Sequence, residues 1–374
     1  MVTDLQGSVK NCLLQFSVLP SIYIPYNDLI DFLKIGNNKK QFNEDLNLLK
    51  DKGLINETDD GSFKCHQVLQ EVIRNQLKPT TEDCKYLIDS LIAKLEYDPI
   101  ANAVEKAKYL PFAESILHGI NEENLRLASL AHNMNDVYDA IGEYQKAIEC
   151  ELKSIAIREK LDSDSIELAQ SYNNIGVSYR RQKKLKESLE FHRKALKIRR
   201  RLLGKYHSDI AESCNNIAII YYEFKNIRRA IKFYDLALNL LKNKLSEDKN
   251  SLANEANLYN CLGMCFSRIG NYEKSKELLE SSLKIQMTIY EKNHPDIITS
   301  MKNLGIILFH QNKYYDAIEL LEKVFELQIS LYQHNHPFIL DTMEILQVIY
   351  NKTKQIEKED YFANKILEIT EVKQ

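Results

Sequence analysis

The sequence has no tryptophan and little glycine or proline: its 374 residues include 11 glycines and 7 prolines. Since glycine and proline supply many turns and helix breaks, their scarcity leaves little material for long loops or large sheets. No segment approaches the roughly 20 apolar residues of a membrane span. The first 20 residues carry one lysine, and Gln15 interrupts their apolar stretch, which is a poor match to an export signal. We expect a helical protein with no membrane segment.

The net charge does not indicate a particular partner, and the cysteines do not indicate a compartment outside the cell. Lysine and arginine (50) nearly balance aspartate and glutamate (53), so the net charge does not point to nucleic acid or an acidic surface. The seven cysteines are odd in number and scattered, which is typical of reduced thiols rather than a disulfide framework. We expect a cytoplasmic protein.

Catalytic motifs are missing as well. The sequence contains no G-x-x-x-x-G-K-[ST], no G-x-S-x-G and no H-E-x-x-H, so we predict no enzyme, no cofactor and no metal site. Cys261 and Cys265 share one face of a predicted helix, but zinc needs four ligands and no histidine follows nearby. We interpret both cysteines as packing residues. His294 and His336 precede prolines in two separate loops, and we interpret them as loop structure.

The strongest pattern is an internal repeat. The stretches 173–179, 215–221, 260–266 and 302–308 align, and their last residues lie 42, 45 and 42 positions apart. The register extends back to Tyr138 and forward to Tyr350, which makes six units. A small residue recurs three positions before the end of each stretch, at Gly176, Ala218, Gly263 and Gly305. Two helices approach closely only where side chains are nearly absent. The pattern therefore predicts stacked helical hairpins.

This repeat resembles the tetratricopeptide family, and its period of about 42 residues resembles the kinesin-light-chain type. The loops 204–211, 291–298 and 333–340 are similar to that type's histidine-proline loop, with Pro295 and Pro337 in the first helical turn. The resemblance implies an all-α, right-handed α-solenoid of about six hairpins. We expect the repeats at 127–167, 168–209, 210–252, 253–296, 297–338 and 339–371.

The N-terminal residues follow a different pattern. Helical patterns predict three helices at 8–18, 25–34 and 41–52. A β-hairpin is predicted next, with strands at 54–57 and 62–65 and its turn at 58–61, and a last helix at 66–77. Three to four helices plus a hairpin suggest a winged helix. We expect this small domain at 1–80, a helical spacer at 81–126 and the repeats at 127–374.

The amino-acid sequence of this block resembles the winged-helix module of NB-ARC and other STAND nucleotide-switch ATPases. The matching segments are the opening helix, residues 65–74, and the spacer at 110–117, where Phe112 replaces the family's histidine. The resemblance implies that His66 senses nucleotide phosphates, if an ATPase module is present. Cys65 and Gln67 depart from the family's motif beside it. The alternative is that His66 caps the helix that it begins.

Polar columns on the first helix of each hairpin are the candidate binding surface. In this repeat class these helices line the groove, and asparagine can both donate to and accept from a peptide backbone. We predict that the groove binds a protein or peptide through His132, Asn133, Asn173, Asn174, Asn215, Asn216, Asn260, Lys302 and Asn303. The alternative is that these asparagines join neighbouring helices and set their stacking.

Charge gives a second clue to the partner. Twelve basic residues and two acidic ones lie between Arg180 and Lys205, a run that is usually a solvated outer face. Arg180 and Arg181 nevertheless lie at predicted groove-edge positions, together with Arg268 and His310. We predict a partner with an acidic segment or a phosphate.

Three functions follow from these patterns. The first is the non-catalytic sensor or partner-docking C-terminal part of a STAND-type protein. The second is a free-standing tetratricopeptide adaptor without an ATPase. The third, a DNA-binding winged helix, is disfavoured because residues 1–80 carry nine basic and ten acidic side chains.

Overall fold

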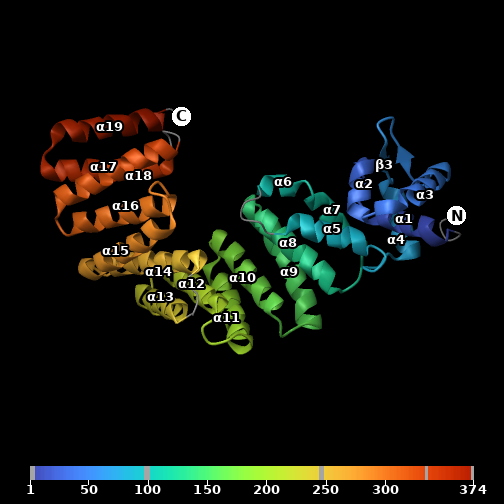
Figure 1. Cartoon of the computed structure of the whole chain (residues 1–374), viewed down its shortest axis with the longest axis horizontal. Helices are drawn as coiled ribbons and strands as arrows, with labels where there is room; N and C mark the ends of the chain where they lie inside the picture. The colour runs from blue at the N-terminus through green and yellow to red at the C-terminus, as the bar shows by residue number, and fades with distance from the viewer. Residues whose placement is uncertain (1–4, 97–101, 244–247, 333–335, 372–374) are drawn as a thin grey trace. The chain divides into compact units, whose positions relative to one another are not determined.

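The computed structural model describes residues 5–96, 102–243, 248–332 and 336–371 (Figure 1). Positions 97–101, 244–247 and 333–335, which belong to the predicted spacer, third repeat and last histidine-proline loop, lie outside the described residues. The chain divides into two compact units, residues 1–202 and 203–374. Among the described residues, strands occur only in the first unit.

The N-terminal block contains a small sheet among helices. Its elements are α1 (Gly7–Val18), β1 (Ile24–Pro25), α2 (Tyr26–Leu33), α3 (Lys39–Asp51), β2 (Asn56–Glu57), β3 (Ser62–Lys64) and α4 (Gln67–Leu77). The predicted helices and the predicted hairpin are confirmed to within two residues at most ends. Strand β1 was not predicted; it pairs antiparallel with β3, so the order is β1-β3-β2. Pro25 is tolerated there because β1 lies at an edge.

Helix α4 is fixed to the end of α1 by side-chain hydrogen bonds. Gln70 Nε2 donates to the carbonyls of Phe16 (2.9 Å) and Leu19 (2.8 Å), and Arg74 donates to the carbonyl of Ser17 (2.9 Å). Gln70 is buried, so these bonds satisfy carbonyls that the end of α1 leaves without helical partners. The block is therefore closed by its last helix.

A helical spacer connects this block to the hairpins without a break in the core. It consists of α5 (Lys85–Leu95), α6 (Ala103–Ala107) and α7 (Leu110–Gly119). Phe112 packs on Phe32 of α2 with ring centroids 4.9 Å apart. A Cβ on Gly119 would lie 2.9 Å from Val18 Cγ1, so α7 approaches α1 closely. One hydrophobic cluster runs from α1 through the spacer into the first hairpin.

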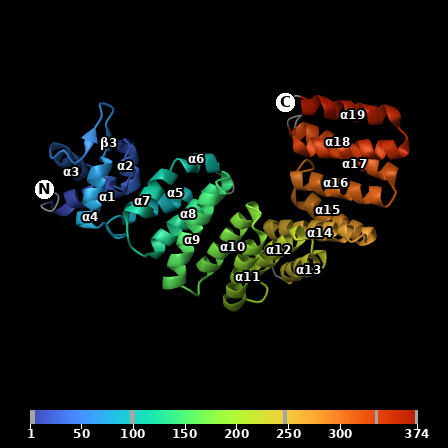
Figure 2. The ribbon, with the colours of Figure 1, turned by 180° about the vertical axis from the view of Figure 1, so that it is seen from behind.

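The remaining helices form the predicted solenoid of hairpins (Figures 1 and 2). The first unit holds α8 (Leu125–Ala140) with α9 (Tyr144–Leu161) and α10 (Ile166–Arg181) with α11 (Leu185–Leu202). The second unit holds α12 (Ser208–Glu223) with α13 (Ile227–Lys242), α14 (Lys249–Arg268) with α15 (Tyr272–Ile289), α16 (Pro295–His310) with α17 (Tyr314–Leu331), and α18 (Pro337–Thr353) with α19 (Ile356–Glu371). Within each unit every hairpin helix packs on the next one along the chain.

The first helix of every hairpin ends in the same turn. One residue there has a positive φ, always four positions after the repeated apolar residue, at Gly142, Lys183, Lys225, Gly270, Asn312 and Lys354. The next N–H donates back to the carbonyl of that apolar residue, as Lys184 does to Tyr179 (2.9 Å). This 6→1 bond is a Schellman motif, which satisfies a carbonyl at the helix end. The six-fold period is therefore visible in the backbone.

The predicted small column has the expected steric role. A Cβ on Gly305 would lie 2.7 Å from Leu321 Cγ, and one on Gly263 would lie 2.9 Å from Leu279 Cγ. In the second hairpin, Gly176 faces the ring of His192, and its carbonyl accepts a hydrogen bond from Ser188 (2.6 Å). Glycine therefore lets the two helices of a hairpin pack at close range.

The loop histidines, interpreted from the sequence as loop structure, cap the helices that follow them. His294 Nδ1 accepts from the N–H of Asp296 (3.2 Å), and His336 Nδ1 accepts from the N–H of Phe338 (3.2 Å). Pro295 and Pro337 are the first residues of α16 and α18, where a missing N–H has no consequence. His207 caps α12 in the same way (3.2 Å).

Candidate functional site

The predicted groove residues of the first hairpin are engaged inside the protein. His132 Nδ1 donates to Glu151 Oε1 (2.9 Å), and Glu151 is fully buried. Asn133 Nδ2 donates to the carbonyl of Ile92 (2.9 Å), which ties α8 to the spacer helix α5. Both side chains are partly exposed. Their present contacts hold helices together.

The second hairpin repeats this arrangement 41 residues later. His192 Nδ1 lies 3.1 Å from Asn173 Oδ1, and Asn173 is only 3% exposed. Asn174 Nδ2 donates to Asp136 Oδ1 (2.7 Å), which joins α10 to α8. This bond between neighbouring hairpins supports the stacking alternative for Asn174.

Burial sets the charges of this polar network. Burial raises the pKa of Asp136 to about 6, with Glu151 and Asp139 adding to the effect and His132 opposing it. Burial opposes the charge of His132, but Glu151 outweighs it, so the pKa of His132 is raised. Burial, Arg180 and Arg199 lower the pKa of His192 to about 3. His192 is therefore neutral at physiological pH, and Asp136 titrates near pH 6.

The predicted basic edge of the groove is partly neutralised. The exposed Arg181 forms an ion pair with Asp139 of α8 and donates to its carbonyl (3.1 Å). Its guanidinium also lies 5.8 Å from the ring of Tyr144. Arg180 is half-buried and has contacts of its own. An acidic partner would therefore compete with Asp139 for Arg181.

Most of the basic run beyond Arg181 lies on α11. Arg199 is fully buried and donates to Gln170 Oε1 (2.7 Å). Lys194 pairs with Glu190 (3.2 Å), and Arg201 pairs with Asp164. The solvated charges of this run agree with the outer face that its pattern predicts. The buried Arg199 does not.

The predicted residues of the second unit also contact one another. Asn303 Nδ2 donates to Asn260 Oδ1 (3.0 Å), which joins α16 to α14. Lys302 pairs with Asp341 (2.5 Å) on α18. Arg268 donates to the hydroxyl of Tyr222 (3.1 Å), and His310 stacks on Tyr272 with centroids 5.1 Å apart. Asn216 has contacts of its own.

Asn215 lines a small hollow between α12 and α14. The hollow has a volume of about 110 Å³, and its polar lining consists of Ser208, Glu212, Asn215, Asn254 and Asn257. Asn254 and Asn257 are exposed and were not predicted, although their three-residue spacing on one helix places them on the same face. The amide and hydroxyl groups around this hollow can both donate and accept hydrogen bonds.

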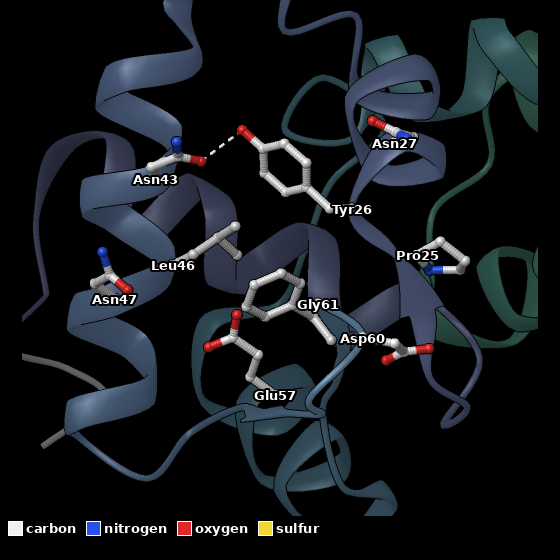
Figure 3. A pocket seen from close by; sticks show the side chains of 10 residues that line it. Pro25, Tyr26, Asn27, Asn43, Leu46, Asn47, Glu57, Asp60 and Gly61 are labelled. Carbon is white, nitrogen blue, oxygen red and sulfur yellow. Dashed lines mark hydrogen bonds between the residues drawn. The ribbon is translucent and has the colours of Figure 1, made fainter.

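A second hollow lies in the N-terminal block (Figure 3). It has a volume of about 530 Å³, and Figure 3 shows Asn43 and Asn47 on one side and Asn27 on the other. Tyr26 donates to Asn43 Oδ1 (2.5 Å). The two carboxylates that line the hollow, those of Glu57 and Asp60, are exposed. The residues that line this hollow include amides and carboxylates but no lysine or arginine.

The described part of the chain contains no group of three or more histidine, cysteine, aspartate or glutamate residues that could hold a metal ion. No helix within it is long and apolar enough to cross a membrane. His66 is exposed, and its Nδ1 accepts from the N–H of Val68 (3.3 Å), so it caps α4 as the alternative interpretation predicted. Its role toward a nucleotide stays a prediction.

Comparison with known families identifies the repeats. Residues 167–243 and 254–330 match the tetratricopeptide repeat family. The matched segments contain helices α10 to α13 and most of α14 with α15 to α17, so these hairpins are tetratricopeptide repeats. The sequence matches no curated protein.

Solved structures with TM-scores above 0.5 show a similar fold. A STAND protein with a tetratricopeptide repeat sensor from Pyrococcus horikoshii aligns with 99% of this chain and 58% of its own, with 19% identity and a TM-score of 0.56. This chain therefore spans less than two thirds of that protein. The quorum sensor NprR from B. thuringiensis aligns with 81% of this chain and 93% of its own, with 11% identity and a TM-score of 0.55. A putative kinesin light chain with TPR-like repeats from Podosopora anserina aligns with 57% of this chain and all of its own, with 22% identity and a TM-score of 0.47.

Proposed function

We propose that this chain is a non-catalytic scaffold that binds a protein or peptide, and that it acts as the sensor arm of a STAND-type nucleotide switch in the cytoplasm. The observation that carries the switch proposal is the similarity to the Pyrococcus horikoshii protein over 99% of this chain. That similarity includes the N-terminal block and the spacer as well as the repeats. The order of the three parts supports a shared architecture.

Within this proposal, residues 1–80 are a winged-helix module, residues 81–126 a spacer, and residues 127–374 the repeats. The order α1-β1-α2-α3-β2-β3-α4 with its three-stranded sheet supports the winged helix. His66 Nε2 makes no hydrogen bond with a described residue, so it is available to a phosphate if an ATPase module precedes the chain. Since Nδ1 accepts a hydrogen bond, Nε2 carries the ring proton, and an N–H donor at a helix N-terminus suits such a contact.

The partner binds across the first helices of the repeats. Asn215, Asn254 and Asn257 offer donors and acceptors around one hollow, which suits an extended peptide backbone. Other predicted positions are already joined in pairs, such as Asn303 with Asn260. Those pairs set the register of the hairpins that presents the hollow. The acidic preference rests on Arg180, Arg181, Arg268 and His310.

A peptide-display selection on the immobilised chain tests the binding function. We expect enrichment of a peptide family whose affinity falls at least tenfold in the triple variant Asn215→Ala, Asn254→Ala and Asn257→Ala. The matched control is Asn27→Ala with Asn43→Ala, which removes amides from the hollow of Figure 3 and should leave the affinity unchanged. Failure to enrich any family, or equal loss in both variants, would contradict the proposal.

The acidic preference has its own test. Substituting glutamate for Arg180 and Arg181 should weaken the binding of acidic peptides and reduce the salt dependence of that binding. Unchanged affinity and salt dependence would remove the acidic partner while leaving the scaffold function intact.

The free-standing adaptor is the alternative. It uses the same repeat surface and needs no ATPase module. The reading frame upstream of residue 1 in the source genome separates the two, because the switch proposal requires a G-x-x-x-x-G-K-[ST] sequence there. An in-frame stop codon directly upstream would favour the adaptor.

A further inference from the structure

Another hollow lies beside helix α3, on the opposite face of this helix from the hollow in Figure 3. This cavity has a volume of about 640 Å³ and lies between α1, the segment 33–45 and residues 82–86. Whereas the Figure 3 hollow takes Asn43 and Asn47 from α3, this one takes Gln41, Phe42 and Asp45. Its volume falls within the range of small-molecule sites, roughly 300–1,000 Å³.

The lining of this cavity contains three carboxylates, those of Asp45, Glu82 and Asp83, and no lysine or arginine. Glu82 has cationic neighbours, since Lys85 lies 3.8 Å away and Arg126 lies 3.5 Å away. Asp83 accepts from the N–H of Thr80 (2.9 Å). These two carboxylates are therefore satisfied without a ligand.

Asp45 differs from both of them. It is 3% exposed, and its Oδ1 accepts hydrogen bonds from Ser8 Oγ and Gln41 Nε2, each at 3.0 Å. No described residue donates to its Oδ2, and none forms an ion pair with it. A buried carboxylate with only neutral donors lacks the cation that normally compensates for lost hydration.

Two neighbouring groups support this interpretation of Asp45. Gln15 Nε2 donates to the carbonyl of Asp83, which leaves its buried Oε1 without a hydrogen bond. Burial raises the pKa of the Cys12 thiol, and the charge of Asp45 raises it further. The cavity therefore holds the Asp45 carboxylate, whose Oδ2 has no donor among the described residues, beside the apolar side chains of Leu33, Ile35 and Phe42.

We propose that this cavity is a binding site for a guanidinium or alkylammonium group on an apolar stem, with Asp45 as its counter-ion. The cation's N–H groups bond Asp45 Oδ2, while the stem packs on Phe42 and Leu33. A guanidinium suits a carboxylate because it offers parallel donors. This site lies outside the repeat surface, so it is independent of the proposed peptide binding.

Isothermal titration of the full chain with agmatine tests the site. We expect one site per chain and at least tenfold weaker binding in the isosteric variant Asp45→Asn. Glu57→Gln, which neutralises an exposed carboxylate of the Figure 3 hollow, is the matched control and should bind as the wild type does. Absence of agmatine binding, or equal affinity in Asp45→Asn, would overturn the proposal.

A second measurement does not depend on a variant that folds. Butylurea has a similar shape but no charge, so it should bind the wild-type chain at least tenfold more weakly than agmatine; equal binding would overturn the proposal. N-acetyl-arginine amide distinguishes the source of the cation. Binding comparable to that of agmatine would assign the site to an arginine side chain of a polypeptide, and much weaker binding would assign it to a free small cation.

Discussion

The hairpins of the two units differ in what fills the same position of the second helix. In the first unit that position holds Glu151 and His192, each bonded to a polar residue of the first helix. In the second unit it holds Tyr234, Leu279, Leu321 and Ala363, and the two leucines pack against glycines. The backbone turn is the same in all six hairpins. The repeat therefore keeps its backbone constant and varies the chemistry of its interior.

This difference has energetic consequences. A leucine stabilises a hairpin by burial, whereas a buried ionisable pair is stabilising only while both partners are present. The first unit therefore responds to pH and to loss of a single charge, and the second unit responds to loss of volume. Four predictions test this contrast, from the largest effect to the smallest.

Glu151→Ala should destabilise the first unit by about 3–5 kcal/mol. The substitution leaves His132 without its partner and Arg158 without the nearby negative charge. Urea denaturation followed by circular dichroism measures the effect. Glu151→Gln is the control, since it keeps the volume and should cost less. A loss below about 1 kcal/mol in Glu151→Ala would show that the pair is not structural.

Asp136 should make the first unit less stable as the pH rises from about 4 to about 7. Its pKa is raised to about 6, whereas that of an unfolded aspartate is about 3.9. The stability contributed by a group with a raised pKa is present below the unfolded pKa and is lost as the pH passes the folded pKa. Wild type should lose at most about 3 kcal/mol relative to Asp136→Asn over this range.

Urea denaturation of both proteins at several pH values between 4 and 7 checks this prediction. The equivalent positions of the second unit, Ile219 and Ile306, cannot titrate and provide the internal comparison. Parallel pH profiles for wild type and Asp136→Asn would contradict it.

Gly305→Ala should destabilise the second unit by about 1–3 kcal/mol, because the added Cβ would lie 2.7 Å from Leu321 Cγ. Gly204→Ala is the matched control, since a Cβ there has no neighbour within 4 Å. Thermal unfolding of both variants measures the difference. Equal melting temperatures would show that the helices can separate at no cost.

Gly270→Ala should cost about 1 kcal/mol, because Gly270 has φ +80° in the turn of its hairpin. The same turn contains lysine at Lys225 with φ +61°, so Lys225→Gly should change stability by less than about 1 kcal/mol. Denaturation midpoints of the two variants provide the comparison. A larger effect in Lys225→Gly than in Gly270→Ala would contradict the shared role of this turn.

Much of the fold could be predicted from the sequence because its period is regular. The apolar column at Tyr179, Tyr221 and Phe266 and the glycine column beside it located the hairpins. Strand β1 was missed because it has two residues and includes Pro25, which signals a loop. The left-handed turn residues were missed because lysine and asparagine fill four of the six positions.

The candidate site was harder to predict than the fold. Asparagine has the same chemistry whether it bonds a ligand or a neighbouring helix, so the column could not separate Asn215 from Asn174. The bond from Asn133 to Ile92 links segments 41 residues apart, in different parts of the sequence pattern. Such pairs depend on how the helices pack. The spacing of residues in a single sequence does not show which side chains meet.

Hydroxyl-radical footprinting of the chain with a display-selected peptide tests the central claim most directly. That claim is that the first helices of the tetratricopeptide repeats form the binding surface. We predict protection of Tyr222 on α12, which is half-buried and accepts a hydrogen bond from Arg268 of α14. Exposed side chains of second helices, such as Met287 on α15 and Tyr315 on α17, should react as in the free chain. Protection of Met287 and Tyr315 with unchanged labelling of Tyr222 would contradict the account.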